Sequence, residues 1–129
     1  MSPEELNKFS ERLPGPLYGF DAKELLENPA NVILKIGDDV AIFEEESPFV
    51  YSGHYLFSSR GKEAISVAKQ MLSVMFNKHK AKVIKGLTPL DNLGALWITR
   101  RLGFDNYGNI ETLAGPMRLS ILTKKEYTE

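Results

Sequence analysis

Cysteine is absent from this chain of 129 residues, which excludes disulfides, thiolate metal sites and a cysteine nucleophile. An excess of basic charge is also missing, because 16 Lys and Arg residues are balanced by 17 Asp and Glu residues. A nucleic-acid-binding domain usually carries a clear positive charge, so we expect no nucleic-acid partner. The hydrophobic runs are too short to span a membrane, and the acidic start of the sequence does not resemble a signal peptide. We therefore expect a cytoplasmic protein without a membrane partner.

Several catalytic patterns are missing as well. No group of His, Asp and Glu has metal-ligand spacing, so no metal is expected. The sequence contains no Walker-type glycine loop, and no order of Ser, His and Asp that favours a catalytic triad. What is present is an ordinary globular composition, with 43% hydrophobic and 26% charged residues. The length suits a single domain, residues 1–129, with a hydrophobic core of its own.

Two short helices are expected before the first strand. Ser2 and Glu5 form a capping box for the first helix, which ends at Pro14. Asp21 caps the second helix, and Pro29 follows its end.

The rest of the chain alternates between strand and helix periods. In chain order it predicts a hairpin of strands 32–36 and 40–43 around a turn at 37–39, an acidic loop 44–48, a strand 49–58, a long helix 62–79, a strand 81–84, a loop 86–91, a helix 92–102, a turn-rich segment 104–109, a strand 117–122 and a frayed tail 124–129. Gly53 interrupts its strand, which often marks a bulge or the close approach of another backbone or a ligand. The crossover through the long helix predicts two parallel strands side by side. We therefore expect the α+β class, with a mixed and mainly antiparallel sheet.

The junction between strand 49–58 and the long helix carries the first chemical signal. Gly61 follows Ser59 and Arg60, and Lys62 opens the helix. Free amide groups at a helix start bind anions, so a phosphate or pyrophosphate is the natural ligand. The alternative is an ordinary strand-to-helix turn with two solvated cations.

A second signal lies at the helix 92–102. Asn92 stands at its start, Ala95 is small enough to allow close approach on the same face, and Gly103 with Phe104 ends it. The alternative is a capped amphipathic helix with a glycine stop. Trp97, in the middle of this helix, is expected in the core.

Taken together, these two segments resemble the GNAT superfamily of N-acyltransferases over roughly residues 32 to 122. The resemblance implies a GNAT-like sheet with a splayed parallel strand pair, and acetyl-CoA as co-substrate. Gly61 takes the place of the central glycine of the loop whose amides hold the pyrophosphate. The positions that the resemblance assigns to coenzyme binding are Tyr55, Phe57, Ser59, Arg60, Gly61, Lys62, Asn92 and Ala95.

Three positions depart from the pattern of that superfamily. Ser58 stands where Gln or Arg is usual, and Glu63 where Gly or Ala is usual. Thr99 occupies the position at which many members carry a tyrosine that protonates the leaving thiolate. A threonine hydroxyl is a much poorer acid than a phenol.

Acyl transfer to an amine needs a base, a polarised carbonyl and a proton for sulfur. Backbone amides near Tyr55 to Phe57 are candidates for polarising the carbonyl. His54 is the best candidate base, because histidine titrates near neutral pH; the alternative is a structural strand histidine. Glu44 to Glu46 could accept a proton through water or attract a basic substrate, or simply form a solvated loop. Tyr107 is a candidate acid if its loop folds back, although loop aromatics usually just pack.

The sequence leaves the present activity open. The segment from Gly86 to Asn92 is similar to short GNAT-like proteins of tailed bacteriophages, of which some are acetyltransferases and some are head-assembly or internal virion proteins. One hypothesis is an acyl-CoA-dependent N-acetyltransferase with an unknown amine or protein acceptor. A second hypothesis is a GNAT-fold protein without catalysis that binds a phage or host protein, in the host cytoplasm or the virion. A third is an α+β binding module of no named family. The edge of the last strand is a candidate homodimer contact.

Overall fold

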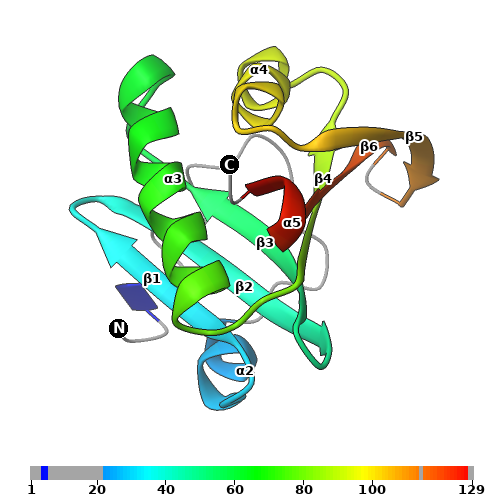
Figure 1. Ribbon diagram of the computed structural model, residues 1–129. Coiled ribbons are helices and arrows are strands. Elements are labelled where there is room, and N and C mark those ends of the chain that lie inside the picture. The colour runs from blue at the N-terminus through cyan, green and yellow to red at the C-terminus, as the bar shows by residue number, and fades with distance from the viewer. Residues whose placement is uncertain (1–3, 6–21, 114, 128–129) are drawn as a thin grey trace.

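The computed structural model describes residues 4–5, 22–113 and 115–127 of the chain. One sheet of six strands, in the order β1-β2-β3-β4-β6-β5, forms its centre (Figure 1). In chain order the elements are α2 (Ala22–Glu27), β1 (Val32–Ile36), β2 (Asp39–Ser47), β3 (Val50–Leu56), α3 (Gly61–Asn77), β4 (Val83–Pro89), α4 (Leu93–Arg101), β5 (Asp105–Thr112), β6 (Gly115–Thr123) and α5 (Lys124–Tyr127). The pair β3–β4 is parallel and the other pairs are antiparallel, which confirms the expected mixed α+β sheet.

The first three strands form an antiparallel meander. The predicted hairpin is confirmed, since Val32 pairs with Phe43 and Ile36 pairs with Asp39. The predicted acidic loop 44–48 is wrong, because β2 continues to Ser47 and Glu44 and Glu45 pair with β3. This end of β2 is largely exposed, so its residues have the polar composition of a loop. Backbone pairing with β3 and side-chain bonds to Tyr51, Ser52 and His54 hold it in the sheet.

The long helix α3 covers one face of the sheet and supplies much of the core (Figure 1). Its apolar residues recur at helical spacing, so they form one buried stripe. The stripe packs against Phe43 and Tyr51 of the sheet. Its buried members are Ala64, Val67, Ala68, Met71, Leu72, Met75 and Phe76. The predicted helix 62–79 is thus confirmed.

The strand after α3 is longer than the sequence predicts. β4 runs to Pro89, so the predicted loop 86–91 is wrong over 86–89. The reason is its partner: all seven residues of β4 pair with β6. The helix that follows agrees with the prediction, with Asn92 as its N-cap.

The C-terminal hairpin of β5 and β6 contradicts two predictions. Residues 104–109 do not form a turn-rich segment, because β5 pairs with β6 from Asp105 onwards, with a register shift between Asn106 and Asn109. The last strand, β6, does not offer a sheet edge for a dimer, because it lies between β4 and β5. The two edges of the sheet are β1 and β5.

The end of the chain is ordered over residues 124–127, so a frayed tail is wrong there. These residues form α5, and the ring of Tyr127 stacks on Phe76 with 4.8 Å between centroids. Its hydroxyl donates to the carbonyl oxygen of Lys69 at 2.9 Å. These contacts tie the end of the chain to α3.

At the start of the chain, α2 confirms the second short helix. The first predicted helix and the cap Asp21 lie outside the described residues, except that residues 4–5 are helical.

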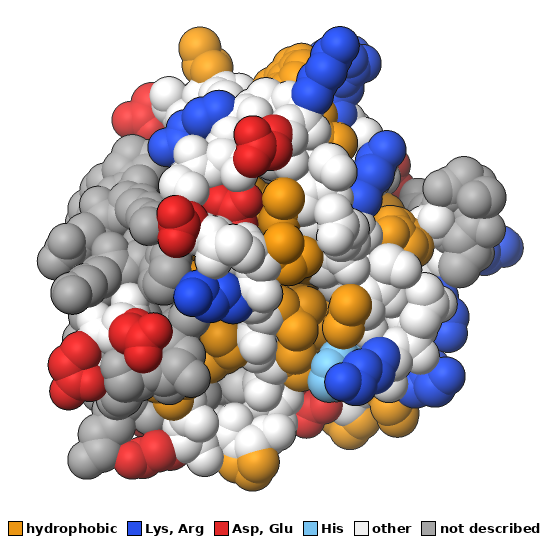
Figure 2. Space-filling view, turned by 90° about the vertical axis from the view of Figure 1, so that its left-hand side faces the viewer, with side chains coloured by type: hydrophobic (Ala, Val, Ile, Leu, Met, Phe, Trp, Pro, Cys, Tyr) orange, Lys and Arg blue, Asp and Glu red, His pale blue; other side chains and the backbone are white. Residues whose placement is uncertain are grey.

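None of the described helices is long and apolar enough to cross a membrane. The face that lies to the left in Figure 1 carries hydrophobic side chains along its middle, with acidic and basic side chains interspersed around them (Figure 2). This mixture agrees with the balanced net charge.

Candidate functional site

The parallel strands β3 and β4 pair over only three residue pairs. Val50 pairs with Val83, Tyr51 with Ile84, and Ser52 with Lys85. Beyond this point β4 pairs with β6 alone, and β3 pairs with β2 alone. The expected splayed pair is therefore present. Backbone groups along the parting edges need other partners, which an inserted ligand can supply.

The loop at the far end of β3 leads directly into α3. Its cap residue Arg60 is extended (φ −134°, ψ 161°) and makes no side-chain cap. Gly61 then adopts φ +58°, a left-handed conformation that glycine tolerates best. The first backbone bond of the helix runs from the amide of Ala64 to the carbonyl of Arg60, at 3.4 Å. By helix geometry, the amides of Gly61, Lys62 and Glu63 have no acceptor in a preceding turn, so they are suited to an anion.

A buried carboxylate, Asp39, fixes the start of this loop. Its Oδ1 accepts from the amides of Ser58 (2.8 Å) and Ser59 (3.0 Å) and from the Ser58 hydroxyl (3.4 Å), and its Oδ2 accepts from the Ser59 hydroxyl (2.6 Å). Burial by itself would raise the pKa of Asp39, but the hydrogen bonds from Ser59 and Ser58 outweigh it and lower the pKa. From its sequence position Asp39 is expected only in a turn, and no local pattern indicates this role.

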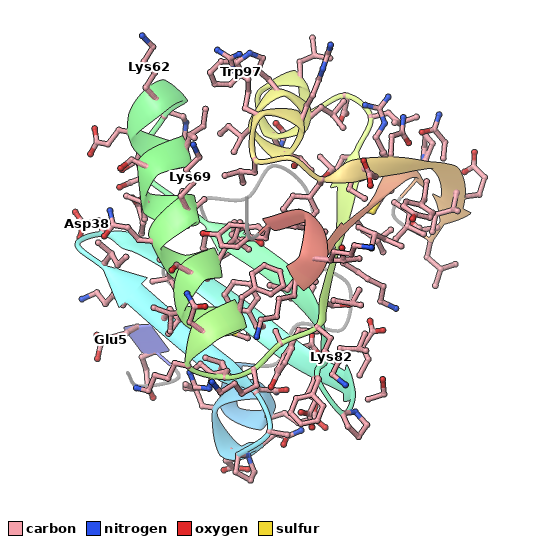
Figure 3. The ribbon with its side chains drawn as sticks, in the orientation of Figure 1. Glu5, Asp38, Lys62, Lys69, Lys82 and Trp97 are labelled. Carbon is pink, nitrogen blue, oxygen red and sulfur yellow. The ribbon has the colours of Figure 1, made fainter. Side chains whose placement is uncertain are left out.

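The charged side chains of the loop are turned away from its free amides. The Nη1 of Arg60 donates to the carbonyls of Phe57 (2.7 Å) and Ser59 (2.9 Å), so this guanidinium lies back along the loop. Lys62 is exposed and points outward from the end of α3 (Figure 3). Glu63 accepts from the Ser59 hydroxyl at 3.2 Å. The junction thus carries the cations Arg60 and Lys62 and the carboxylate Glu63, and Asp39 of β2 supports it from below.

Aromatic side chains line the α3 side of β3. The ring of Tyr55 makes edge-on contacts with Phe43 (5.8 Å between centroids) and Phe57 (5.9 Å). Its hydroxyl is buried with no hydrogen-bond partner in the described part of the chain. Burial raises the pKa of Tyr55 well above its ordinary value. The Gly53 position is close to this ring, since a Cβ there would lie 2.8 Å from the Tyr55 oxygen. Gly53 pairs with Phe43 in regular register, so the strand has no bulge there, and the groups that approach Gly53 are side chains and not another backbone.

His54 lies on the opposite face of β3, because side chains alternate along a strand. Its Nε2 is 2.8 Å from Oε1 of Glu44 on β2. Nearby on the same face, Glu46 accepts a hydrogen bond from Ser52 and pairs with Lys85 of β4. Burial would raise the pKa of Glu46, but the hydrogen bonds of Lys85 and Ser52 together with nearby positive charge lower it. This polar group lies where β3 and β4 begin to part.

The second predicted segment is held by its own local bonds. The side chain of Asn92 accepts from the amide of Ala95 at 3.1 Å, and the hydroxyl of Thr99 donates to the carbonyl of Ala95 at 2.8 Å. The prediction for Trp97 is wrong, because this ring is 41% exposed on α4, with the Arg101 guanidinium 5.3 Å from its centroid (Figure 3). α4 has no fully buried residue, so even its apolar side chains keep some exposure.

Tyr107, the predicted acid, lies far from the predicted base His54. It lies in the edge strand β5 and is 60% exposed. Three strand spacings separate β5 from β3, which is roughly 14 Å or more. Of the predicted site residues, His54, Tyr55, Phe57 and the loop 59–62 thus follow one another along β3 and the turn into α3, with His54 and Tyr55 on opposite faces of the strand. Asn92 and Ala95 lie at the start of α4, and Tyr107 lies on the edge strand β5. Among the described residues, no group of three His, Asp or Glu side chains is placed to hold a metal ion.

Comparison with known proteins gives similarity in structure alone. By sequence, the chain matches no protein-family model and no curated protein. Its fold is similar to a chimera of the spermidine N-acetyltransferase SpeG from Vibrio cholerae and hSSAT, with a TM-score of 0.75, 12% identity, and coverage of 100% of this chain and 97% of that one. It is also similar to the SpeG F149A mutant from Vibrio cholerae (TM-score 0.76, 11% identity, 100% and 95% coverage). A GNAT-family acetyltransferase from Bacillus anthracis matches with a TM-score of 0.65 and 13% identity, over 81% of this chain and 72% of that one. The chain thus has the fold of these acetyltransferases.

Proposed function

We propose that the chain is an acyl-CoA-dependent N-acyltransferase that transfers an acetyl group to an amine. The observation that carries this proposal is the opening of the sheet between β3 and β4, with the Gly61 loop at the end of the same strand. The open edge of β3 leads toward the loop that is suited to an anion. This arrangement suits a ligand that has a pyrophosphate and an extended arm. The similar folds, which belong to acetyltransferases, support the same conclusion.

In this proposal the free amides of Gly61, Lys62 and Glu63 hold the pyrophosphate of acetyl-CoA. Their geometry suits it, because the left-handed Gly61 and the helix start turn successive amides toward one concavity. The arm of the coenzyme follows the unpaired side of β3 toward His54. Ser59 follows His54 by five positions, which is about 16 Å of extended strand. Asn92 and Ala95 would flank the arm from α4.

The proposed reaction is a direct attack of the amine on the thioester. His54, oriented by Glu44, takes a proton from the substrate ammonium, directly or through water. The neutral nitrogen forms a bond to the carbonyl carbon, whose oxygen is stabilised by a backbone amide of β3 near Tyr55. The carbon–sulfur bond then breaks, and the second nitrogen proton passes to the departing sulfur. The products are the amide and free coenzyme A, with one proton left on the base.

The face on which His54 lies favours a cationic acceptor. Glu44 is 44% exposed and Glu46 is 42% exposed, so both carboxylates can reach a substrate from solvent. Lys85 already balances Glu46, which leaves Glu44 as the carboxylate nearest the base. The similar SpeG chimera is a spermidine N-acetyltransferase, and spermidine is a polyamine that carries positive charge.

A second candidate function is a GNAT-fold protein without catalysis, acting through protein contacts in phage assembly or on a host factor in the cytoplasm. Two observations favour it. The Thr99 hydroxyl already donates to the Ala95 carbonyl, and Tyr107 lies far from His54. Among the described residues, no side chain is identified that could protonate the leaving thiolate of coenzyme A in place of the usual tyrosine. A homodimer is compatible with both functions.

Isothermal titration with acetyl-CoA and with coenzyme A tests the proposal. We expect binding in the micromolar range that is strongly weakened in Arg60→Glu, because the new carboxylate would stand beside the free amides. Lys69→Glu is the matched control, since it makes the same charge change on the exposed side of α3 away from the loop. Absence of binding at millimolar ligand, from a folded sample, would reject the enzyme and favour a search for a protein partner by pull-down.

A further inference from the structure

A cavity of about 270 Å³ lies between α4 and the hairpin of β5 and β6. Figure 1 shows α4 beside this hairpin. Its charged lining consists of Arg100 from α4 and Arg118 from β6, and its apolar lining includes Leu96 and Phe104. The volume lies just below the usual range of pockets for drug-sized ligands, so it suits a small molecule.

Within the described part of the chain, Arg118 has no partner for its charge. Its Nε is buried without a hydrogen-bond acceptor, and no carboxylate forms an ion pair with it among the described residues. Its neighbours in the sheet, Thr88 on β4 and Asn109 on β5, are both uncharged. A buried donor of a charged group is costly when it lacks an acceptor. The fold therefore keeps a cation at the cavity wall that an anion would stabilise.

The second guanidinium strengthens this argument. Arg100 is exposed, lines the same cavity, and likewise has no ion pair within the described part of the chain. Its neighbour Arg101 differs, because it lies over the ring of Trp97. Two unpaired guanidinium groups at one small cavity repel each other unless a negative charge lies between them.

We propose that this cavity binds a small organic oxyanion, a carboxylate or a phosphate. Arg118 holds the anion from the cavity wall, and Arg100 closes on it from the solvent side. Planar guanidinium groups match the geometry of both oxyanions and bind them with paired hydrogen bonds. Leu96 and Phe104 contact the short apolar part of the ligand.

The proposed anion site takes no part in acyl transfer, although it lies next to the proposed coenzyme site. Thr99 also lines the cavity, and it follows Asn92 and Ala95 at helical spacing on α4. A ligand here would thus lie next to the helix face proposed for the coenzyme. For this reason the test must separate the anion from coenzyme A.

The experiment is an NMR titration that follows the Nε–Hε signal of Arg118, assigned by its loss in Arg118→Gln. The probes are succinate and inorganic phosphate, and the neutral control is succinamide. We expect one of the two anions to move this signal with saturation in the millimolar range, while succinamide leaves it unchanged. A response to succinate alone indicates a carboxylate ligand, and a response to phosphate alone indicates a phosphate ligand.

Variants and competition complete the test. Arg100→Gln should weaken binding about tenfold or more, which corresponds to the loss of one charged hydrogen-bond pair. Arg101→Gln, a matched control outside the cavity, should leave it unchanged. If Arg118→Gln does not fold, the Nε–Hε signal is assigned by through-bond correlation in the wild type, and its titration together with Arg100→Gln tests the proposal. The proposal is overturned if neither anion moves the Arg118 signal, if succinamide moves it equally, or if saturating coenzyme A abolishes anion binding.

Discussion

The Oδ2 of Asp39 lies 2.6 Å from the hydroxyl oxygen of Ser59, although 20 positions separate the two residues in the chain. Asp39 begins β2 and Ser59 belongs to the loop before α3. Only 2% of Asp39 is exposed, so the bond is shielded from water. The shape of the proposed pyrophosphate loop therefore depends on a hairpin that does not itself touch the ligand.

Replacing Asp39 with Asn tests this dependence. The side chain of Asn has a single acceptor oxygen, so it cannot accept both from the two backbone amides, as Oδ1 does, and from the Ser59 hydroxyl, as Oδ2 does. It also loses the charge that strengthens these bonds. We expect Asp39→Asn to lower the free energy of unfolding by about 1–3 kcal/mol and to weaken coenzyme A binding. Urea unfolding and isothermal titration measure the two effects. Asp38→Asn, in the adjacent exposed turn, is the control; an equal effect in both variants would contradict a special role for Asp39.

The lowered pKa of Asp39 also predicts how stability changes with pH. Because the folded-state pKa lies below the unfolded value, the ionised carboxylate stabilises the fold above the unfolded pKa, and this contribution is lost as the pH falls through the folded pKa. The stability difference between the wild type and Asp39→Asn should thus be constant near neutral pH and shrink below about pH 4. Urea unfolding at several pH values measures it. A difference that does not change with pH would show that charge plays no part.

Gly61 is expected to be required for its conformation and not for space. Its φ is +58°, yet a Cβ there would meet no atom within 4 Å. Gly61→Ala should therefore cost about 1 kcal/mol of stability through backbone strain and weaken acetyl-CoA binding by shifting the loop amides. Gly37→Ala is the matched control, because that site is also open and has φ +59°, but it lies in the turn between β1 and β2. Both variants should lose similar stability in thermal unfolding, and only Gly61→Ala should weaken acetyl-CoA binding in titration; an unchanged Kd in Gly61→Ala would reject the argument.

Gly53 is expected to be required for space. A Cβ there would lie 2.8 Å from the Tyr55 hydroxyl and 3.3 Å from the ring of Phe43. Gly53→Ala should destabilise the fold by about 1–3 kcal/mol through overpacking, whereas Tyr55→Phe should be neutral or stabilising, because it removes a buried hydroxyl without a partner. The double variant should lose less stability than Gly53→Ala alone. Additive effects in this cycle would mean that the two groups do not touch.

The sequence predicts those elements in which the apolar residues are the buried residues, because the spacing of the apolar residues then shows the type of element. The stripe of α3 from Ala64 to Phe76 is fully buried, so its helical period is visible in the residues themselves. The hairpin around Gly37 is visible for the same reason, since β-rich runs flank a turn. The loop at Gly61 could be predicted because strand, glycine and helix follow one another locally.

The failures concern elements that are strands only because a partner pairs with them. The residues of β5 are exposed on both faces except at its last position, so they show no alternation, and pairing with β6 alone decides their structure. Glu44 and Glu45 have the composition of a loop, yet they extend β2 because β3 pairs with them. Asp39 could not be identified, because its partners Ser58 and Ser59 are distant in sequence and serine is common in turns.

His54 is the residue whose replacement should separate catalysis from binding. Its Nε2 is 2.8 Å from Glu44, which suits a base held by a carboxylate. With the amine acceptor that gives the highest turnover, we expect His54→Gln to lower kcat about 10²–10⁴-fold and to leave the Kd for acetyl-CoA unchanged, because the coenzyme is held by the distant loop. Glu44→Gln should lower kcat less, since it acts through His54. His79→Gln is the control, because that histidine follows the far end of α3. If His54→Gln keeps its kcat, the His54–Glu44 pair serves the structure of the sheet and another group must remove the proton.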